Sequence, residues 1–569
     1  MAGRFCRASL LVILVVGIVV SPPPSWSQPT SVDRPVPRTT NGDASSGTTG
    51  QPLLGVVWRP PDAPGPALRA LGRIHALGAT AVRLTSLPPT DALFHRADSL
   101  GLRLFVDLPV ASVAAPALGD ALNEAQPRLT QIRKLARQHP SVQYVGLARH
   151  ADTTVPQACA VLRDWTERLH DAPTSLRTYY VTPFRPSVDR CTDAVDLALF
   201  DTRGRPRPVD RWQEENPEPT RTGIGGLGTW VRAGAASGLR VPHSAERQAR
   251  LLERTVTRLL DSTSAAPAAV FVYRWQDEPN ARLPDRRYGL HGADGTPRPA
   301  TRVVEGIYTG TQRVFAFPSG SPPSSPHALI LLGWGLIGLL AVLSASSPFA
   351  RQTAYRYFVA HGFYRDAVRE GRDVSPWLNV LLLGVGAVAM GLVVTVLAQL
   401  AAAAPTTEHV LNALPSALST PLATGITQPV LAGAAGAGLV ALLFLGWTGA
   451  LTLTARSVSS FSPSQALMLV VWPGWPVLPG MVVALVTAMA PPASPSLLGG
   501  LLVGGGLLAS LGVVMRVLSD YHAVTDVSLP VTMALALPSP PVLAGLVLSA
   551  GAAQYQVPLS LLWHLLTGT

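Results

Sequence analysis

Residues 53–58 read Leu-Leu-Gly-Val-Val-Trp, residues 81–85 read Ala-Val-Arg-Leu-Thr, and residues 103–108 read Arg-Leu-Phe-Val-Asp-Leu. Each run is short and rich in β-branched and other apolar residues, which favours a strand that is buried on both faces. Between the runs lie Ala67–Leu77 and Asp91–Leu100, which are amphipathic and long enough for helices. Strands that alternate with helices in this way indicate βα units and a parallel sheet.

The same alternation continues as far as Gly310. Five more strands are predicted, at Val142–Leu147, Leu176–Val181, Val195–Phe200, Thr222–Leu227 and Ala268–Trp275. The helices predicted between them are Pro127–Gln138, Pro156–His170, Arg207–Glu215 and Ser244–Leu260. Eight such units in about 260 residues predict an α/β fold, a (β/α)8 TIM barrel over residues 52–310.

The N-terminus has the features of an export signal. Arg4 and Arg7 precede the apolar run Leu10–Val20, and the stretch Ser25-Trp26-Ser27 has small residues at the two positions that a signal peptidase recognises. Cleavage is expected after Ser27, so residues 1–27 are predicted to be a signal peptide. An uncleaved anchor is the alternative, and under both interpretations the barrel segment is exported. Residues 28–51 are rich in Ser, Thr, Pro and Gly, which predicts a flexible linker. A second linker is expected at residues 311–327.

Residues 328–569 are predicted to form an all-α transmembrane domain of about six helices, because each apolar run approaches the ~20 residues that a bilayer requires. The expected spans are Ala328–Ala345, Leu378–Ala403, Pro429–Thr454, Ala466–Ala490, Leu497–Met515 and a Pro-interrupted one at Leu529–Gly551. None of these ranges contains Asp, Glu, Lys or Arg, which disfavours an ion-coupled transporter and favours an anchoring bundle.

Arginines between the spans predict the orientation. The loops after the first, third and fifth spans contain Arg351–Arg372, Arg456 and Arg516, whereas the other loops have none. Under the positive-inside rule these three loops are cytoplasmic. We therefore expect a multi-pass protein of the cell membrane, in contact with the lipid bilayer and with its barrel outside the cytoplasm.

Charge and cysteines narrow the possible partners. The net charge is +11, but Lys134 is the only lysine and the arginines are scattered, so no nucleic-acid partner is expected. Of three cysteines, Cys6 lies in the signal, which leaves Cys159 and Cys191 to form one disulfide in an oxidising compartment. No Cys/His spacing suggests a metal, and no cofactor is expected.

Several short motifs carry a resemblance to a known family. They are Gly78–Arg83, Ala97–Leu102, Val106–Pro109, His139–Val142, Ser244–Arg250 and Tyr288–Ala300, and they come one after another in a fixed order. In that order the segment resembles the catalytic barrel of glycoside hydrolases of family 2 and related retaining glycosidases. The resemblance spans most of Pro52–Gly310 and implies a TIM barrel that binds a glycan.

Both catalytic positions that the resemblance implies are altered. A retaining glycosidase needs two carboxyl groups about 5 Å apart, one as acid/base and one as nucleophile. Where the family has Asn-Glu after the fourth strand, this chain has Arg149-His150. Where the family has its nucleophilic Glu after the seventh strand, this chain has Gly225–Gly228, which puts Gly226 at that position. The two expected carboxylates are therefore replaced.

Ligands of TIM barrels bind at the C-terminal ends of the strands. The residues expected there as glycan contacts are Arg83, Asp107, His150, Asp201, Trp275 and Asp277. Each has a structural alternative: Arg83 neutralises Asp107, Trp275 is a core aromatic residue, and His150 and Asp277 are polar loop residues. Asp152 and Glu278 are the alternative pair for an unconventional hydrolysis.

Three functions remain open from the sequence. The first is a catalytically degenerate, carbohydrate-binding barrel anchored in the membrane. The second is an active glycosidase that uses displaced carboxylates. The third is a scaffold or sensor domain for the helical bundle.

Overall fold

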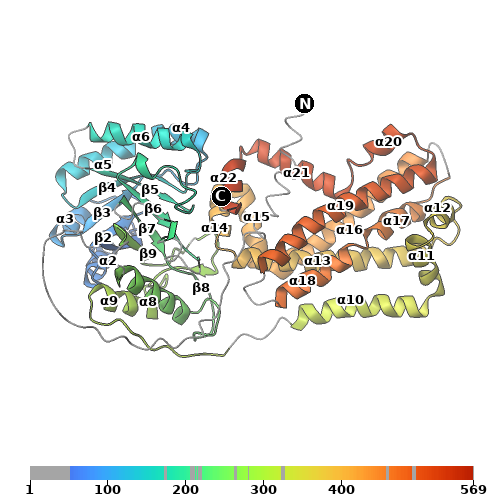
Figure 1. Ribbon diagram of the computed structural model, residues 1–569, viewed down its shortest axis with the longest axis horizontal. Coiled ribbons are helices and arrows are strands. Elements are labelled where there is room, and N and C mark those ends of the chain that lie inside the picture. Colours follow the sequence, from blue (N-terminus) through green and yellow to red (C-terminus); the bar gives the residue numbers. More distant parts are fainter. Residues whose placement is uncertain are drawn as a thin grey trace. The chain divides into compact units, whose positions relative to one another are not determined.

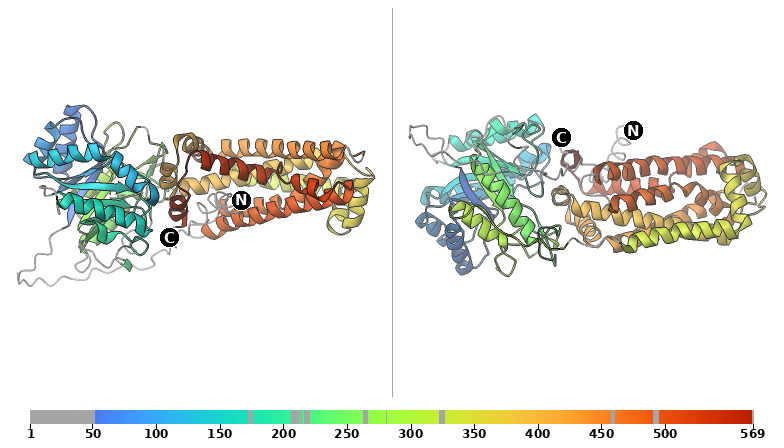
Figure 2. Two further views of the ribbon diagram at one scale, coloured as in Figure 1. Left: turned by 90° about the horizontal axis from the view of Figure 1, so that it is seen from above. Right: turned by 60° about the horizontal axis from the view of Figure 1, so that its bottom comes forward.

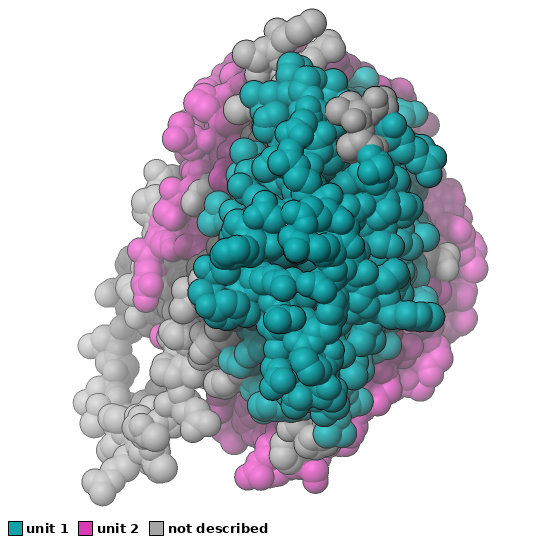
Figure 3. Space-filling model, turned by 90° about the vertical axis from the view of Figure 1, so that its right-hand side faces the viewer, with its two compact units in different colours: residues 1–26, 324–407, 415–559 teal, residues 27–323, 408–414, 560–569 magenta. Residues whose placement is uncertain are grey.

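A computed structural model describes residues 52–171, 176–205, 212, 214–215, 221–261, 266–279, 281–321, 327–456, 460–489 and 495–567. The predicted signal 1–27, the linker 28–51 and most of the predicted helix Arg207–Glu215 lie outside the described residues. The chain divides into two compact units, coloured separately in Figure 3. One contains the N-terminal half together with two short segments, Glu408–Leu414 and Ser560–Thr569, and the other contains the remainder of the C-terminal half.

The first unit is a closed barrel of eight parallel strands. In order around the barrel they are β1 (Leu53–Trp58), β2 (Ala81–Leu84), β3 (Arg103–Asp107), β4 (Val142–Arg149), β5 (Arg177–Thr182), β6 (Leu197–Asp201), β7 (Thr222–Leu227) and β9 (Ala269–Tyr273). Parallel pairing of β9 with β1 closes the ring, for example at Gly55 and Phe271. The predicted (β/α)8 barrel is confirmed.

Helices surround the strands on the outside of this barrel (Figures 1 and 2). They are α2 (Pro64–Ala76), α3 (Ala92–Ser99), α4 (Leu118–Glu124), α5 (Gln126–Gln138), α6 (Pro156–His170), α8 (Ala245–Asp261) and α9 (Pro299–Tyr308). In α8 the buried residues Ala249, Leu252, Val256 and Leu259 recur at helical spacing, so one stripe of the helix faces the barrel. Inside the ring, Phe105 packs against Tyr179 and Phe271.

Some short elements are not predicted by the sequence. Two of them are the helices α4 and α9. The others are the strands β8 (Val231–Arg232) and β10 (Arg286–Arg287), which pair antiparallel in a two-stranded ribbon. Two residues per strand give no periodicity to detect.

The second unit is helical. Its elements are α10 (His327–Ser346), α11 (Pro348–Phe358), α12 (His361–Arg369), α13 (Pro376–Ala403), α15 (Ser416–Thr427), α16 (Pro429–Ala455), α17 (Pro463–Val471), η4 (Trp472–Gly474), α18 (Val477–Met489), α19 (Pro495–Thr525), α20 (Leu529–Ala534) and α21 (Pro540–Gln554). The short helices α14 (Thr407–Ala413) and α22 (Leu559–Thr567) lie almost wholly within the segments that belong to the barrel unit. In the bundle, α13 packs against α16 and α18 (Figure 1).

Among the described residues, five helices are long and apolar enough to cross a membrane: Ala328–Ser346, Pro376–Ala403, Pro429–Ala455, Pro463–Met489 and Leu502–Thr525. The count reaches six if α21 and α22, bent by 116° at their break, make one span. The predicted sixth span differs, because Leu529–Gly551 is broken between α20 and α21. The protein is thus a membrane protein by the length and composition of its helices.

The expectation that the spans contain no charge is wrong for the fifth. This span continues to Thr525 and therefore includes Arg516 and Asp520. Asp520 is fully buried and lies within 4 Å of Arg365, Arg516 and His361. Paired in this way, a carboxylate can be buried at the end of a long apolar helix.

Candidate functional site

A cavity of about 840 Å³ opens at the C-terminal ends of the barrel strands. Residues at the ends of β4, β6 and β9 line it, among them Arg149, Asp201 and Tyr273. The lining includes nine arginines: Arg59, Arg83, Arg149, Arg203, Arg274, Arg282, Arg286, Arg287 and Arg298. It includes five carboxylates: Asp201, Asp277, Glu278, Asp294 and Glu408. Among the residues that the structure describes, the lining therefore carries an excess of positive charge.

Arg83 and Asp107 form a closed pair at the floor of this mouth. Arg83 donates from Nε and Nη2 to the two oxygens of Asp107, at 3.0 and 2.7 Å, and from Nη1 to the carbonyl of Gly225 at 2.9 Å. Tyr179 donates to Asp107 at 2.5 Å. Burial and the Asp107 charge hold the pKa of Tyr179 well above its ordinary value, so its hydroxyl remains a donor. These contacts tie β2, β3, β5 and β7 together.

His150 and Asp201 form a second buried pair. His150 follows β4 in a left-handed conformation with a φ of 57°, and its Nε2 lies 2.8 Å from Oδ2 of Asp201. Arg203 donates from Nε to both oxygens of Asp201, at 2.9 and 2.8 Å. Because a carboxylate only accepts hydrogen bonds, Nε2 of His150 carries the proton.

The protonation states of this pair are opposite to those of an acid/base catalyst. Burial lowers the pKa of His150 to about 4, and the hydrogen bond and charge of Asp201 offset only part of that loss. Burial raises the pKa of Asp201, but Arg203 and His150 more than reverse this and hold it well below the ordinary value. At neutral pH His150 is therefore neutral and Asp201 is ionised.

The position of Gly226 lies directly beside this pair. A β-carbon on Gly226 would stand 3.0 Å from Oδ1 of Asp201 and 3.5 Å from Cγ of Arg203. The space into which any side chain at position 226 would project is thus occupied by Asp201 and Arg203.

The other carboxylates near the mouth also have partners. Glu278 forms a hydrogen-bonded ion pair with Arg274 and lies 3.9 Å from Arg59. Burial raises the pKa of Glu278, but the hydrogen bond and the charge of Arg274 together lower it by more. The net shift of the pKa is therefore downward. Asp277 is paired with Arg298 and accepts from the backbone of Gly289 at 2.7 Å.

Asp152 has a different environment from Glu278. It is 1% exposed, accepts from Thr154 at 2.6 Å and lies 3.0 Å from Nδ1 of His564. Glu278 is among the described residues that line the cavity, whereas Asp152 is not.

The tryptophans near the mouth are buried rather than presented to the cavity. Trp275 is 2% exposed, and its ring lies 4.2 Å from that of His291 and under Arg73. Trp230 stacks on His243 with a centroid separation of 4.3 Å. The aromatic rings in the described lining are instead those of Tyr273 and Tyr288, and the guanidinium of Arg203 lies 4.0 Å above the Tyr273 ring.

Several residues of the mouth are not among the site residues that the sequence predicts. They are Arg203, Tyr273, Arg274, Tyr288, Arg298 and Glu408. Arg203 comes two residues after Asp201, at the end of a barrel strand, which is the signal that would have identified it. Glu408 lies far along the chain in α14, so no local pattern connects it to the barrel.

His150, Asp201 and His409 have the chemistry of metal ligands and bring their ligand atoms within 4.8 Å of one another. All three are buried, and Nδ1 of His409 has no hydrogen-bond partner among the described residues. However, Arg203 already donates to both oxygens of Asp201. A fixed cation on the carboxylate opposes a second, divalent one, so the cluster is better described as a hydrogen-bonded ion pair.

Outside the mouth, Cys159 of α6 and Cys191 form a disulfide across a Cα separation of 4.7 Å. Cys191 precedes β6, so the bond joins two neighbouring βα units.

No known family's sequence profile matches this chain. No curated protein matches it in sequence either. Solved structures do match it in shape. A GH2 beta-galacturonidase from Eisenbergiella tayi bound to galacturonate is 15% identical with a TM-score of 0.39, and the match covers 47% of this chain and 52% of that one.

Two further matches are similar in extent. A beta-glucuronidase from an uncultured Clostridium is 12% identical with a TM-score of 0.39, covering 46% of this chain and 51% of that one. A beta-glucuronidase from Ruminococcus gnavus is 16% identical with a TM-score of 0.39, covering 45% and 50%. This chain spans about half the length of these enzymes.

Proposed function

We propose that this protein is a membrane-anchored, extracytoplasmic binding protein whose barrel holds an acidic saccharide without cleaving it. The observation that carries the proposal is the charge of the mouth cavity, where nine arginines meet five carboxylates. Four of those carboxylates, Asp201, Asp277, Glu278 and Glu408, are already paired with arginine. Arg83 is neutralised by Asp107, and the positive charge that remains after these pairs favours a ligand that brings its own carboxylate or sulfate groups.

The dimensions and chemistry of the cavity support a small-molecule ligand. Its volume of about 840 Å³ lies within the ~300–1,000 Å³ that is usual for ligand sites. The rings of Tyr273 and Tyr288 line it beside the arginines, which gives a sugar both apolar faces and hydrogen-bond donors. The resemblance of the sequence to glycosidase barrels supports a saccharide over other anions.

The protonation states support binding without hydrolysis. Retaining hydrolysis needs a protonated acid and a free carboxylate nucleophile on opposite sides of the glycosidic bond. Glu278 and Asp201 both have lowered pKa values and arginine partners, so neither holds a proton at neutral pH and neither is free to attack. His150 is neutral and donates a hydrogen bond from Nε2 to Asp201.

The location rests on two sequence features. Arg351–Arg372 after the first span and Arg456 after the third support a cytoplasmic side for those two loops, and the N-terminal segment has the pattern of an export signal. Together they support a barrel on the outer side of the membrane.

A sensor role is the second candidate, and one observation favours it. Glu408 and Asn412 line the same cavity, and in the sequence they lie between the spans α13 and α16. A ligand that contacts them would contact the segment of chain that connects two membrane helices.

The test is equilibrium binding of the full-length chain in detergent to oligosaccharides that carry carboxylates, compared with the same oligosaccharides after carboxyl reduction. Arg149→Gln or Arg287→Gln should each weaken binding of the acidic ligand about tenfold, which corresponds to ~1.4 kcal/mol. Arg137→Gln, an exposed change on α5, should have no effect. Equal affinity for the acidic and the reduced ligands would refute the anionic ligand. Saccharide hydrolysis that Asp152→Ala or Glu278→Ala abolishes would refute the absence of catalysis.

A further inference from the structure

A second group of metal-ligating side chains lies away from the barrel mouth. His95 and Asp98 belong to α3, and His139 directly follows α5 and precedes β4. The ligand atoms of these three residues lie within 4.8 Å of one another. Because α3 precedes β3 and His139 precedes β4, the group lies towards the N-terminal ends of the strands, opposite the cavity.

Two of the three side chains are held in place. Asp98 accepts a hydrogen bond from the backbone of Ser141 at 2.9 Å, and its other oxygen lies 2.7 Å from Nδ1 of His139. The ring of His139 is 3% exposed and packs at 5.6 Å from the ring of Phe94. Because the carboxylate and the imidazole already have a fixed orientation, less conformational entropy is lost when they bind an ion.

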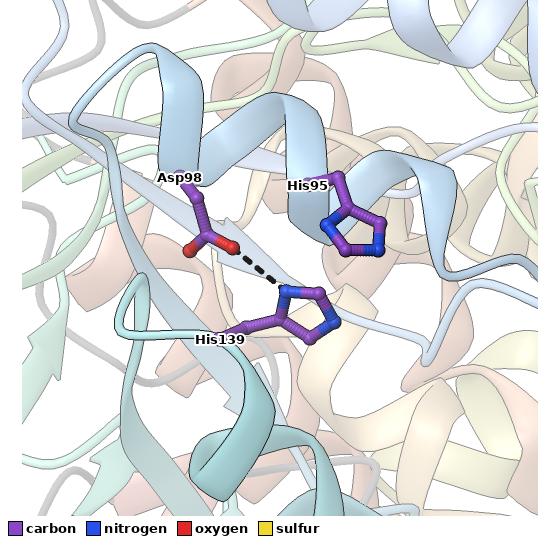
Figure 4. Close-up of side chains that lie close together, drawn as sticks. All are labelled: His95, Asp98 and His139. Atoms are coloured by element: carbon purple, nitrogen blue, oxygen red, sulfur yellow. Dashed lines mark hydrogen bonds and ion pairs between the residues drawn. The ribbon is translucent and has the colours of Figure 1, made fainter.

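His95 is the adjustable member. It is three residues before Asp98, so both side chains project from the same face of α3, and its ring meets that of His139 edge-on at 4.5 Å (Figure 4). His95 is exposed, and its ring nitrogens have no hydrogen-bond partner among the described residues. It can therefore rotate toward the other two without breaking a hydrogen bond to any of the described residues.

We propose that His95, Asp98 and His139 bind a zinc ion, with water in the remaining position. Two imidazoles and one carboxylate are ligands that zinc accepts, at about 2.0–2.2 Å. In a tetrahedral site the ligand atoms stand about 3.4 Å apart, so the Asp98–His139 pair has to open by about 0.7 Å from its hydrogen-bonded distance while His95 swings inward.

Charge distinguishes this group from the one in the mouth. Among the described residues, Asp98 is hydrogen-bonded to His139 and paired with no arginine, whereas both oxygens of Asp201 receive hydrogen bonds from Arg203. A divalent ion at Asp98 therefore does not compete with a fixed cation.

The experiment is zinc binding to the full-length, metal-stripped chain in detergent, purified without a polyhistidine tag. Zinc content after dialysis and the visible spectrum of the cobalt-substituted protein are compared for the unaltered chain, His95→Ala and Asp98→Asn. His75→Ala, which removes an exposed histidine from α2, is the matched control.

The unaltered chain and His75→Ala should each hold one more equivalent of zinc than His95→Ala. Loss of a direct ligand should weaken binding at least ~100-fold, since loss of an outer-shell partner alone costs up to that much. Asp98→Asn keeps a carbonyl oxygen for the Ser141 amide, so it should fold normally and also lose zinc. Equal zinc content in the unaltered chain and in correctly folded His95→Ala would overturn the proposal, as would an absence of zinc in both.

Discussion

Nε of Arg203 donates to both oxygens of the Asp201 carboxylate, at 2.9 and 2.8 Å, and each of the two side chains is at most 5% exposed. The pair stands beside Gly226, whose added β-carbon would lie 3.0 Å from Oδ1 of Asp201. The charges of Arg203 and Asp201 therefore neutralise each other.

Removal of one member of this pair should be costly for stability. Arg203→Met keeps much of the side-chain volume but leaves Asp201 buried without its cation, so we expect the free energy of unfolding of the barrel to fall by about 3–5 kcal/mol. Arg163→Met, which breaks an exposed pair with Asp193, should cost about 1 kcal/mol or less. Chemical denaturation of the full chain, followed by near-UV circular dichroism, measures both. Equal losses for the two variants would contradict the structural role.

His150 should make the barrel less stable in mild acid. Its folded pKa of about 4 lies below its ordinary value of 6.5. Between these two values the unfolded chain therefore binds a proton that the folded chain does not, and stability falls as the pH falls through this window. His150→Asn, which tolerates the left-handed backbone, should reduce the slope of stability against pH by up to about one proton.

The control for this titration is His75→Asn, which changes an exposed histidine. Some slope should remain in His150→Asn, because burial also lowers the pKa of His243 to about 4. A pH profile of unfolding that is identical in His150→Asn and the unaltered chain would show that His150 is already accessible to protons.

A carboxylate introduced at Gly226 should not produce hydrolysis. In Gly226→Glu the new β-carbon meets Oδ1 of Asp201 at 3.0 Å, so we expect a loss of about 1–3 kcal/mol and no turnover of aryl glycosides. Gly119→Glu has open space around its β-carbon and should leave stability nearly unchanged. Turnover by Gly226→Glu would mean that Asp201 and Arg203 move aside readily.

Introduced cysteines test which side of the membrane each part of the chain faces. Arg137→Cys in the barrel should react with a membrane-impermeant maleimide in intact cells, whereas Arg372→Cys in the loop after α12 should react only after permeabilisation. Cys159 and Cys191 are joined in a disulfide and should not react. Labelling of position 372 but not of position 137 in intact cells would reverse the proposed orientation.

The sequence predicts most of the barrel because strand and helix periods differ clearly. β1 and β7 begin and end at the predicted residues, and the remaining barrel strands differ at their ends by one to a few residues. The sequence predicts an end of the fifth span at Met515 because Arg516 is the next residue, yet α19 continues to Thr525 since Asp520 is paired with arginines, one of them from a distant segment. Such compensation depends on tertiary contacts and has no local pattern.

The site is less accessible to sequence reasoning for the same reason. Arg83, Asp107, His150 and Asp201 do lie at the strand ends, as barrel topology requires, but Trp275 turns away from the cavity to pack on His291. The direction in which Arg203 points depends on Tyr273 and on Asp201 together. A linear pattern records the residue type and not this direction.

The barrel unit is made of three separate segments of the chain, and this affects how the barrel should be expressed. A fragment that stopped at residue 321 would leave the buried Asp152 without His564, Arg203 without Glu408, and the guanidinium of Arg282 without the carbonyl oxygens of Leu411 and Leu414. Such a fragment would expose apolar and charged surface that the intact chain covers with its own distant segments. We therefore expect the N-terminal half alone to be a poor substitute for the whole protein, and a fusion that supplies Glu408–Leu414 and Ser560–Thr569 to be the better starting point for crystallisation.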